Sequence, residues 1–151
     1  ILKSPSSPLF RLINKSRRYR GINLINVLEE DMYRSAVKAL NRNEIVGILI
    51  DTAALESRYQ ILSFLGHNVP AATGWLTLAQ RTQAPVIPTI SWREGKKIVI
   101  TFGEPLVVSN TNRNEVISKI KTFFENFIKA HPEQWGMFLN AYETKRVLAG
   151  K

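Results

Sequence analysis

An acid at the end of an apolar run is the first candidate for chemistry in this sequence. Asp51 directly follows residues 45–50, and the small residues Thr73 and Gly74 come further along the chain. In open α/β sheets, ligands bind where strand ends meet helix starts, so this pattern predicts a pocket for an anionic or carbonyl group. The spacing leaves two alternatives open. Asp51 could be an exposed loop acid or a helix cap, and Gly74 could allow close packing against a strand.

A cluster of basic residues near the start of the chain offers a second kind of chemistry. Residues 1–20 contain no acid and include six cations: Lys3, Arg11, Lys15, Arg17, Arg18 and Arg20. The whole chain carries a formal net charge of +9. Such a cluster attracts phosphates, whether of nucleic acid, anionic lipid or a small substrate, and its plain alternative is a solvated basic face. No stacking aromatic platform or nucleic-acid-binding motif accompanies the charges, so nucleic acid is not an expected partner.

Other kinds of active site lack the residues that they need. The chain contains no cysteine, which excludes disulfides and thiolate chemistry. Neither His67 nor His131 has an acid at the spacing of a charge-relay pair, and His131 is explained by its place at a helix end. No metal-binding, nucleotide-binding or serine-nucleophile motif is present. We therefore expect neither a metal nor a cofactor.

Length and composition predict one globular domain. The chain has 151 residues, of which 44% are hydrophobic and 22% charged, enough to bury a core. No apolar run approaches the ~18–20 residues that span a bilayer, and no secretory signal pattern opens the chain. The sequence begins at Ile1 rather than Met, so we expect a fragment whose upstream part could hold a targeting or membrane segment.

Periodicity predicts that helices and strands alternate around these candidates. Helices are expected over residues 9–19, 29–41, 71–81, 112–130 and 135–147. Strands are expected over residues 22–27, 45–50, 86–92 and 97–102, the last two joined as a hairpin across residues 93–95. Residues 45–50 are apolar without alternation, which is typical of a strand buried on both faces. The pattern predicts an α/β fold with a mainly parallel central sheet flanked by helices.

Six short motifs follow one another along the chain. They are R-R-Y-R-G (17–21), E-I-V-G-I-L-I-D (44–51), F-L-G (64–66), A-A-T-G-W-L-T-L-A (71–79), A-P-V-I-P (84–88) and P-E-Q-W (132–135). As a set, they resemble the bacterial lipid A biosynthesis lauroyl/myristoyl acyltransferases of the lysophospholipid acyltransferase superfamily. The resemblance covers nearly the whole chain and implies a glycerolipid acyltransferase-like fold. It also implies transfer of a fatty acyl group from an acyl thioester to a hydroxyl of a lipid A precursor or a related glycolipid or lysolipid.

The catalytic motif of that family, H-x-x-x-x-D/E, does not occur in this chain. The fifth residue after His67 is Ala72, and the fifth residue after His131 is Gly136. The resemblance implies that the family's histidine acts as a general base on the acceptor hydroxyl, helped by the acid. We therefore expect that pair upstream of Ile1. The chain would then be the C-terminal portion of one acyltransferase domain, with its N-terminal part missing and no activity by itself.

The resemblance also implies which residues bind substrate. The matching positions are Arg17, Arg18, Arg20, Gly21, Asp51, Gly66, Thr73 and Gly74. Among them Arg18 is the first choice for a phosphate, because a guanidinium makes paired, charge-assisted hydrogen bonds. Two departures from the family, Thr52 after the aspartate and Gly136 after P-E-Q-W, point to a divergent branch.

Two functional interpretations follow. The first is an acyltransferase at the cytoplasmic face of the bacterial inner membrane. Its partners would be an acyl carrier protein or coenzyme A thioester, a lipid acceptor and the membrane surface. The second is a catalytically inactive module that binds phosphate or an anionic membrane, since the basic segment also carries Leu9, Phe10, Leu12 and Ile13.

Overall fold

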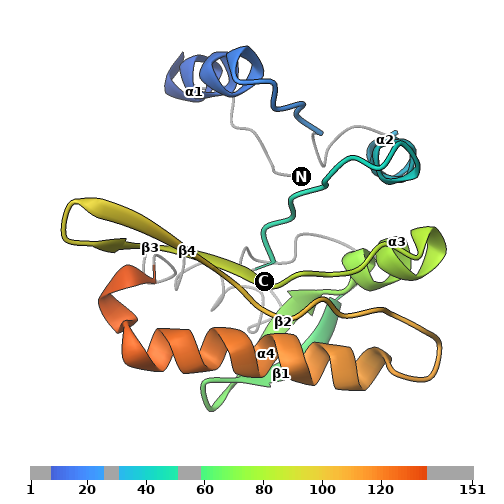
Figure 1. The fold of residues 1–151 in the computed structure, drawn as a ribbon. Helices are drawn as coiled ribbons and strands as arrows, with labels where there is room; N and C mark the ends of the chain where they lie inside the picture. Colours follow the sequence, from blue (N-terminus) through green and yellow to red (C-terminus); the bar gives the residue numbers. More distant parts are fainter. Residues whose placement is uncertain (1–7, 26–30, 51–58, 136–151) are drawn as a thin grey trace. The chain divides into compact units, whose positions relative to one another are not determined.

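The computed structural model describes residues 8–25, 31–50 and 59–135, and these are drawn in colour in Figure 1. The contacts divide the chain into two units, Ile1–Leu49 and Ile50–Lys151, which we describe separately. The predicted helix over 135–147 lies outside the described residues apart from its first residue, Trp135, as do Asp51 and Thr52.

Two helices form the first unit. Helix α1 spans Pro8–Tyr19 and helix α2 spans Met32–Asn41, so both predicted helices are confirmed where they are described. Helix α1 ends in a left-handed cap, because Gly21 has φ of +78°. The N–H of Ile22 donates to the carbonyl of Arg17 (3.0 Å), and the N–H of Gly21 donates to that of Arg18 (3.0 Å). This Schellman pairing explains the glycine of R-R-Y-R-G, since glycine takes a positive φ without steric cost.

The two strands predicted in this part of the chain are not observed. Residues 22–25 and 45–50 form no strand, so both predictions are wrong for the described residues. The side chain of Ile45 is 98% exposed, although an uninterrupted apolar run predicted burial on both faces. A strand is held by hydrogen bonds to a neighbouring strand, and neither of the two described sheets includes residues 45–50. Ile50, which belongs to the second unit, does pack against the hydrophobic core.

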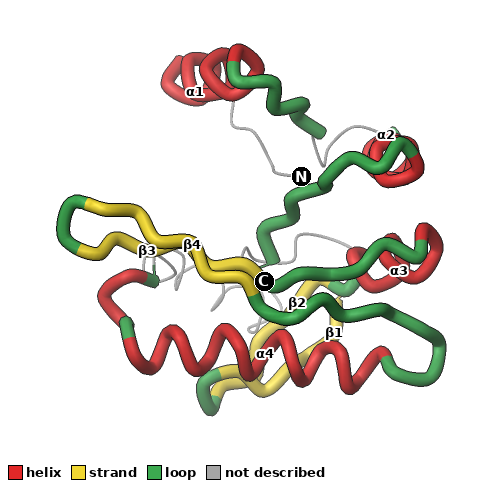
Figure 2. The backbone as a smooth tube through the Cα atoms, in the orientation of Figure 1, coloured by secondary structure: helices red, strands yellow, loops and turns green. Residues whose placement is uncertain are grey.

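The second unit contains two antiparallel hairpins. Strand β1 (Tyr59–Phe64) pairs with β2 (His67–Ala72), and β3 (Thr89–Glu94) pairs with β4 (Lys97–Phe102). An isolated antiparallel bridge between Val86 and Leu106 extends the second ribbon. The hairpin predicted over 86–102 is confirmed, although its first strand begins at Thr89. Figure 2 shows both ribbons, with the helices of the unit in red.

The sheet topology differs from the prediction. The fold is mixed α/β as expected, but the described residues contain only two-stranded antiparallel sheets and no mainly parallel central sheet. Two-residue turns join these strands, whereas parallel neighbours need a crossover of a dozen or more residues. The hairpin of β1 and β2 was not predicted. Residues 71 and 72, expected to open a helix, instead pair with Gln60 and Tyr59.

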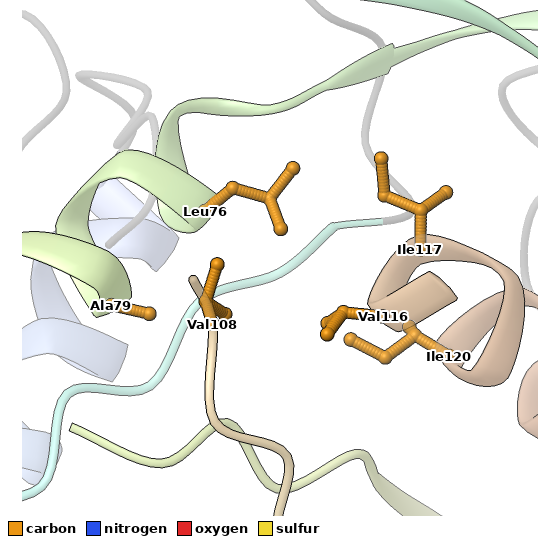
Figure 3. Close-up of a cluster of buried hydrophobic side chains, with 6 residues drawn as sticks. All are labelled: Leu76, Ala79, Val108, Val116, Ile117 and Ile120. Carbon is orange, nitrogen blue, oxygen red and sulfur yellow. The ribbon is translucent and has the colours of Figure 1, made fainter. Parts of the chain in front are cut away.

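A hydrophobic core holds the helices of the second unit together. Helix α3 spans Gly74–Thr82, helix α4 spans Arg113–Ala130, and a 3-10 turn, η1, spans Pro132–Gln134. Figure 3 shows six buried side chains from α3, α4 and the segment between β4 and α4: Leu76, Ala79, Val108, Val116, Ile117 and Ile120. Half-buried side chains from β1 and the Val86–Leu106 bridge surround them. The long helix predicted over 112–130 is confirmed, with Asn112 as its N-cap.

A hydrogen bond joins the turn between β1 and β2 to α4. Leu65 and Gly66 have φ of +50° and +80°, the signs that a two-residue type I′ turn requires. The N–H of Leu65 donates to Glu125 Oε1 (2.8 Å), and Lys121 Nζ lies 3.9 Å from the same oxygen. This charge-assisted hydrogen bond places the first hairpin against the helix.

The positive φ of Gly66 gives a testable prediction about stability. Gly66→Ala is expected to lower the free energy of unfolding by roughly 1–2 kcal/mol, because an L side chain is strained there. Denaturant unfolding of the full-length gene product measures this. The matched control is Gly74→Ala, where a Cβ would meet no atom within 4 Å and φ is not positive. Equal effects of the two substitutions would contradict the assigned turn.

Candidate functional site

A basic face on helix α1 is the strongest candidate site in the first unit. Arg11, Lys15 and Arg18 are spaced by four and three residues, which places them on one side of the helix. All three are exposed, and together with Asn14 they line a shallow hollow. No described acid forms an ion pair with any of them, and α1 itself contains no acid. The field of these charges is therefore not neutralised by a neighbouring carboxylate of the described residues.

The predicted arginines do not share one environment. Arg17 is half-buried, and its guanidinium donates to Asn14 Oδ1 at 3.2 Å. Arg20 is exposed and lies in the turn beyond the last residue of α1. Only Arg18 lines the hollow with Arg11 and Lys15. A guanidinium flanked by two further cations is suited to a phosphate group, which accepts paired hydrogen bonds. Arg18 is therefore the predicted arginine that shares a hollow with other cations, and its role in binding a phosphate stays a prediction.

The small residues predicted to line a pocket have other structural roles as well. Gly21 ends α1, and Gly66 lies in the turn that begins β2. Thr73 and Gly74 come at the other end of β2, where Thr73 is the N-cap residue of α3. A strand rises ~3.3 Å per residue, so Gly66 and Thr73 are roughly 20 Å apart. No small group touches both, although an extended ligand lying along β2 would reach both.

The start of α3 is open. A Cβ added at Gly74 would meet no atom within 4 Å, so close packing against a strand does not explain this glycine. The Thr73 side chain makes no capping hydrogen bond, and the N–H of Leu76 donates to the Thr73 carbonyl at 3.1 Å. The predicted pocket between Asp51 and Thr73-Gly74 depends on a residue outside the described part, so it stays a prediction.

A polar network positions α3 against the beginning of α4. The guanidinium of Arg113 donates to Gln80 Oε1 (2.9 Å) and to Thr77 Oγ1 (3.4 Å). Gln80 Nε2 in turn donates to Asn110 Oδ1. Because Arg113 is the first residue of α4, these bonds fix the orientation of α3 relative to the core. No sequence pattern indicates this network, because its members lie about 30 residues apart and come together only on folding.

Neither histidine side chain is hydrogen-bonded to an acid of the described residues. His67 is exposed at the start of β2, and its side chain has no hydrogen-bond or ion-pair partner among the described residues. His131 is the C-cap residue of α4, as its place at a helix end predicted, and its N–H donates to the Phe127 carbonyl (2.8 Å). Its ring packs against Trp92 at 4.6 Å and Phe127 at 5.1 Å, while Nδ1 lies 3.9 Å from Glu133 Oε1.

The described residues contain neither a metal-binding cluster nor a membrane-spanning helix. No group of three or more His, Asp or Glu side chains in this part of the chain could hold a metal ion. None of the described helices combines the length and the apolar character that a bilayer crossing requires.

The exposed Arg42–Glu44 pair lies just before residues 45–50, and the hydrogen bond from Arg42 lowers the pKa of the Glu44 carboxyl.

Comparison with known proteins identifies a family to which the sequence is similar. A family model described as bacterial lipid A biosynthesis acyltransferase matches residues 3–144. A search of curated proteins finds no match. The family match covers both units of the structure and includes all eight residues predicted to bind substrate.

Proposed function

Since the chain belongs to the family of bacterial lipid A biosynthesis acyltransferases, we propose that it forms the acceptor-binding part of such an enzyme. The acceptor would be a lipid A precursor or a related glycolipid or lysolipid that carries a phosphate. The observation that supports this is the basic face of α1, where Arg18, Arg11 and Lys15 surround one hollow without a described acid as partner. Three converging cations suit a doubly charged phosphate better than a neutral sugar.

The proposed reaction is acyl transfer from a thioester to a hydroxyl. The hydroxyl oxygen of the acceptor bonds to the thioester carbonyl carbon, the carbon–sulfur bond breaks, and the thiol leaves. The hydroxyl proton passes to a general base and then to the leaving sulfur. We propose that the base is the histidine of an H-x-x-x-x-D/E motif outside this sequence, because neither His67 nor His131 has an acid five residues on.

In this proposal the donor is acyl carrier protein or coenzyme A carrying the acyl group, and the enzyme acts at the cytoplasmic face of the bacterial inner membrane. The family match supports lipid substrates and an acyl donor in general terms. An acceptor that is itself a membrane lipid would keep the enzyme at the bilayer surface. The basic face of α1 would then meet phosphates at the height of the headgroups.

The test is an acyl-transfer assay on the full-length gene product. Labelled acyl groups on acyl carrier protein and on coenzyme A are offered separately, with a phosphorylated lipid A precursor and its dephosphorylated form as acceptors. We expect a labelled ester on the phosphorylated acceptor and at least about tenfold less on the dephosphorylated form, given the value of charged hydrogen bonds. No transfer from either donor, or a gene that encodes no H-x-x-x-x-D/E, would contradict the proposal.

A second candidate function is a catalytically inactive module that binds an anionic membrane. It is supported by Leu12, which is exposed on the same helix as the basic face, while the side chains of Leu9 and Phe10 lie outside the described part. Sedimentation with vesicles, with and without anionic lipid, tests it. Salt-sensitive binding without any acyl transfer would favour this candidate over the enzyme.

A further inference from the structure

One face of strand β4 is made entirely of large apolar residues, namely Ile98, Ile100 and Phe102. In the register of the second hairpin, Ile98, Ile100 and Phe102 lie opposite Arg93, Ser91 and Thr89, so these six side chains share one face. The three apolar members are 62%, 55% and 66% exposed. We call this the outer face of the hairpin.

The opposite face of the same ribbon is covered. Ile90 is buried, and the Trp92 ring stacks on Phe127 of α4 with centroids 4.9 Å apart and planes at 17°. His131 lies against the same indole. Helix α4 and its C-terminal cap therefore cover the inner face, whereas no comparable layer of described residues covers the outer face. The ribbon is drawn as β3 and β4 in Figure 2.

Two further large apolar residues beside the Val86–Leu106 bridge, Ile87 and Val107, are also exposed. Five of the twelve exposed large hydrophobic residues in the described part therefore belong to this one ribbon. Soluble monomers rarely expose large apolar patches, so the row of Ile98, Ile100 and Phe102 on one face is a candidate interaction surface.

The charges at the tip of the hairpin indicate what that surface binds. Arg93, Lys96 and Lys97 are exposed around the turn, with Glu94 as the single acid, and none of the four forms an ion pair with a described residue. An apolar row bordered by cations fits the boundary between headgroups and acyl chains, where cations meet lipid phosphates. A six-residue strand is only ~20 Å long, too short for the ~30 Å core, so it would lie on the bilayer.

We propose that the β3–β4 hairpin docks on an anionic lipid surface through Ile98, Ile100 and Phe102, with the cations of its tip on the lipid phosphates. The apolar side chains enter the outer acyl region, and the ammonium and guanidinium groups stay at headgroup depth. This surface belongs to the second unit and does not depend on α1 or on acyl transfer. It would hold the second unit against a membrane.

An environment-sensitive probe tests the docking directly. The described chain has no cysteine, so Ile100→Cys can be labelled with nitrobenzoxadiazole in the full-length gene product, after any cysteine elsewhere is replaced. Vesicles of phosphatidylcholine with phosphatidylglycerol should shift its emission to the blue and allow quenching by nitroxide lipids. A probe at exposed Ser118→Cys on α4 is the control and should not respond. Salt at ~1 M, which shortens the Debye length to about 3 Å, should weaken the response.

Charge substitutions complete the test. Lys97→Gln in the labelled protein should raise the anionic lipid needed for half of the response about fivefold, the value of one cation near such a surface. Lys129→Gln, an exposed cation on α4, should leave it unchanged. A probe at position 100 that is already blue-shifted without lipid would overturn the proposal, since another part of the protein would cover the face. Equal responses at positions 100 and 118, or no response at position 100, would overturn it too.

Discussion

Leu76→Ala is expected to lower the free energy of unfolding by about 2–5 kcal/mol. Leu76 comes from α3, is 1% exposed, and lies in the cluster that joins α3 to α4. Removing its isobutyl group loses transfer free energy and leaves a cavity, because the surrounding helices collapse only partly. Urea denaturation of the full-length gene product, followed by tryptophan fluorescence, measures the change. The slope with urea should stay the same if only stability is altered.

Two neighbouring valines provide the control for this prediction. Val108 is 1% exposed and belongs to the same cluster, whereas Val107 is 56% exposed. Val108→Ala should cost roughly 1.5–3 kcal/mol, since two buried methyl groups are lost, and Val107→Ala should cost less than about 0.5 kcal/mol. Similar losses at both positions would contradict the core described here. A small loss for Leu76→Ala would contradict it as well.

Arg18→Ala is expected to raise the KM for a phosphorylated acceptor by roughly 10- to 100-fold in the full-length enzyme. A charge-assisted hydrogen bond contributes about 1.5–3 kcal/mol, and each 1.4 kcal/mol changes affinity tenfold. The value of kcat should change little, because a phosphate distant from the reacting hydroxyl is bound equally in the ground and transition states. Steady-state kinetics with the acceptor as the varied substrate measures both constants.

The controls separate the site from net charge. Arg34→Ala removes the same charge from an exposed position on α2, where Arg34 pairs with Asp31 at 3.6 Å, and should leave the KM within about twofold. Arg18→Lys keeps the charge but loses the planar fork, so an intermediate KM is expected. An unchanged KM in Arg18→Ala, or an equal rise in Arg34→Ala, would exclude the basic face of α1 as the phosphate site.

The elements predicted correctly are those whose signal is local. Helix α4 was predicted to within one residue at its start, because its apolar residues recur at helical spacing and Pro132 follows its end. Strand β4 was predicted with its observed bounds, because apolar residues recur at every second position and a turn that contains Gly95 precedes it. The cluster of basic residues and the helix that carries most of them were both predicted from residues 1–20. Each of these predictions depends only on residues that lie close together in the sequence.

For the candidate site too, features that depend on nearby residues could be predicted, whereas the distances between segments could not. Residue chemistry and motif order were enough to select Arg18 and to suggest the family, which the match over residues 3–144 confirms. They could not reveal that Gly66 and Thr73 lie at opposite ends of β2, because that strand contains Pro70 and two alanines and lacks a strand-like composition. The pairing with β1 overrides that composition.

The sequence by itself determined the helices α1 and α4, the basic face and the family of this protein. Tertiary structure decided the hairpin of β1 and β2, whereas the hairpin of β3 and β4 could be predicted from the sequence. Residues 45–50 have the composition of a buried strand, yet a strand forms only as part of a sheet, and neither of the two described sheets includes these residues. Helices satisfy their own backbone and can be predicted locally, whereas strands depend on segments that the chain brings together only when it folds.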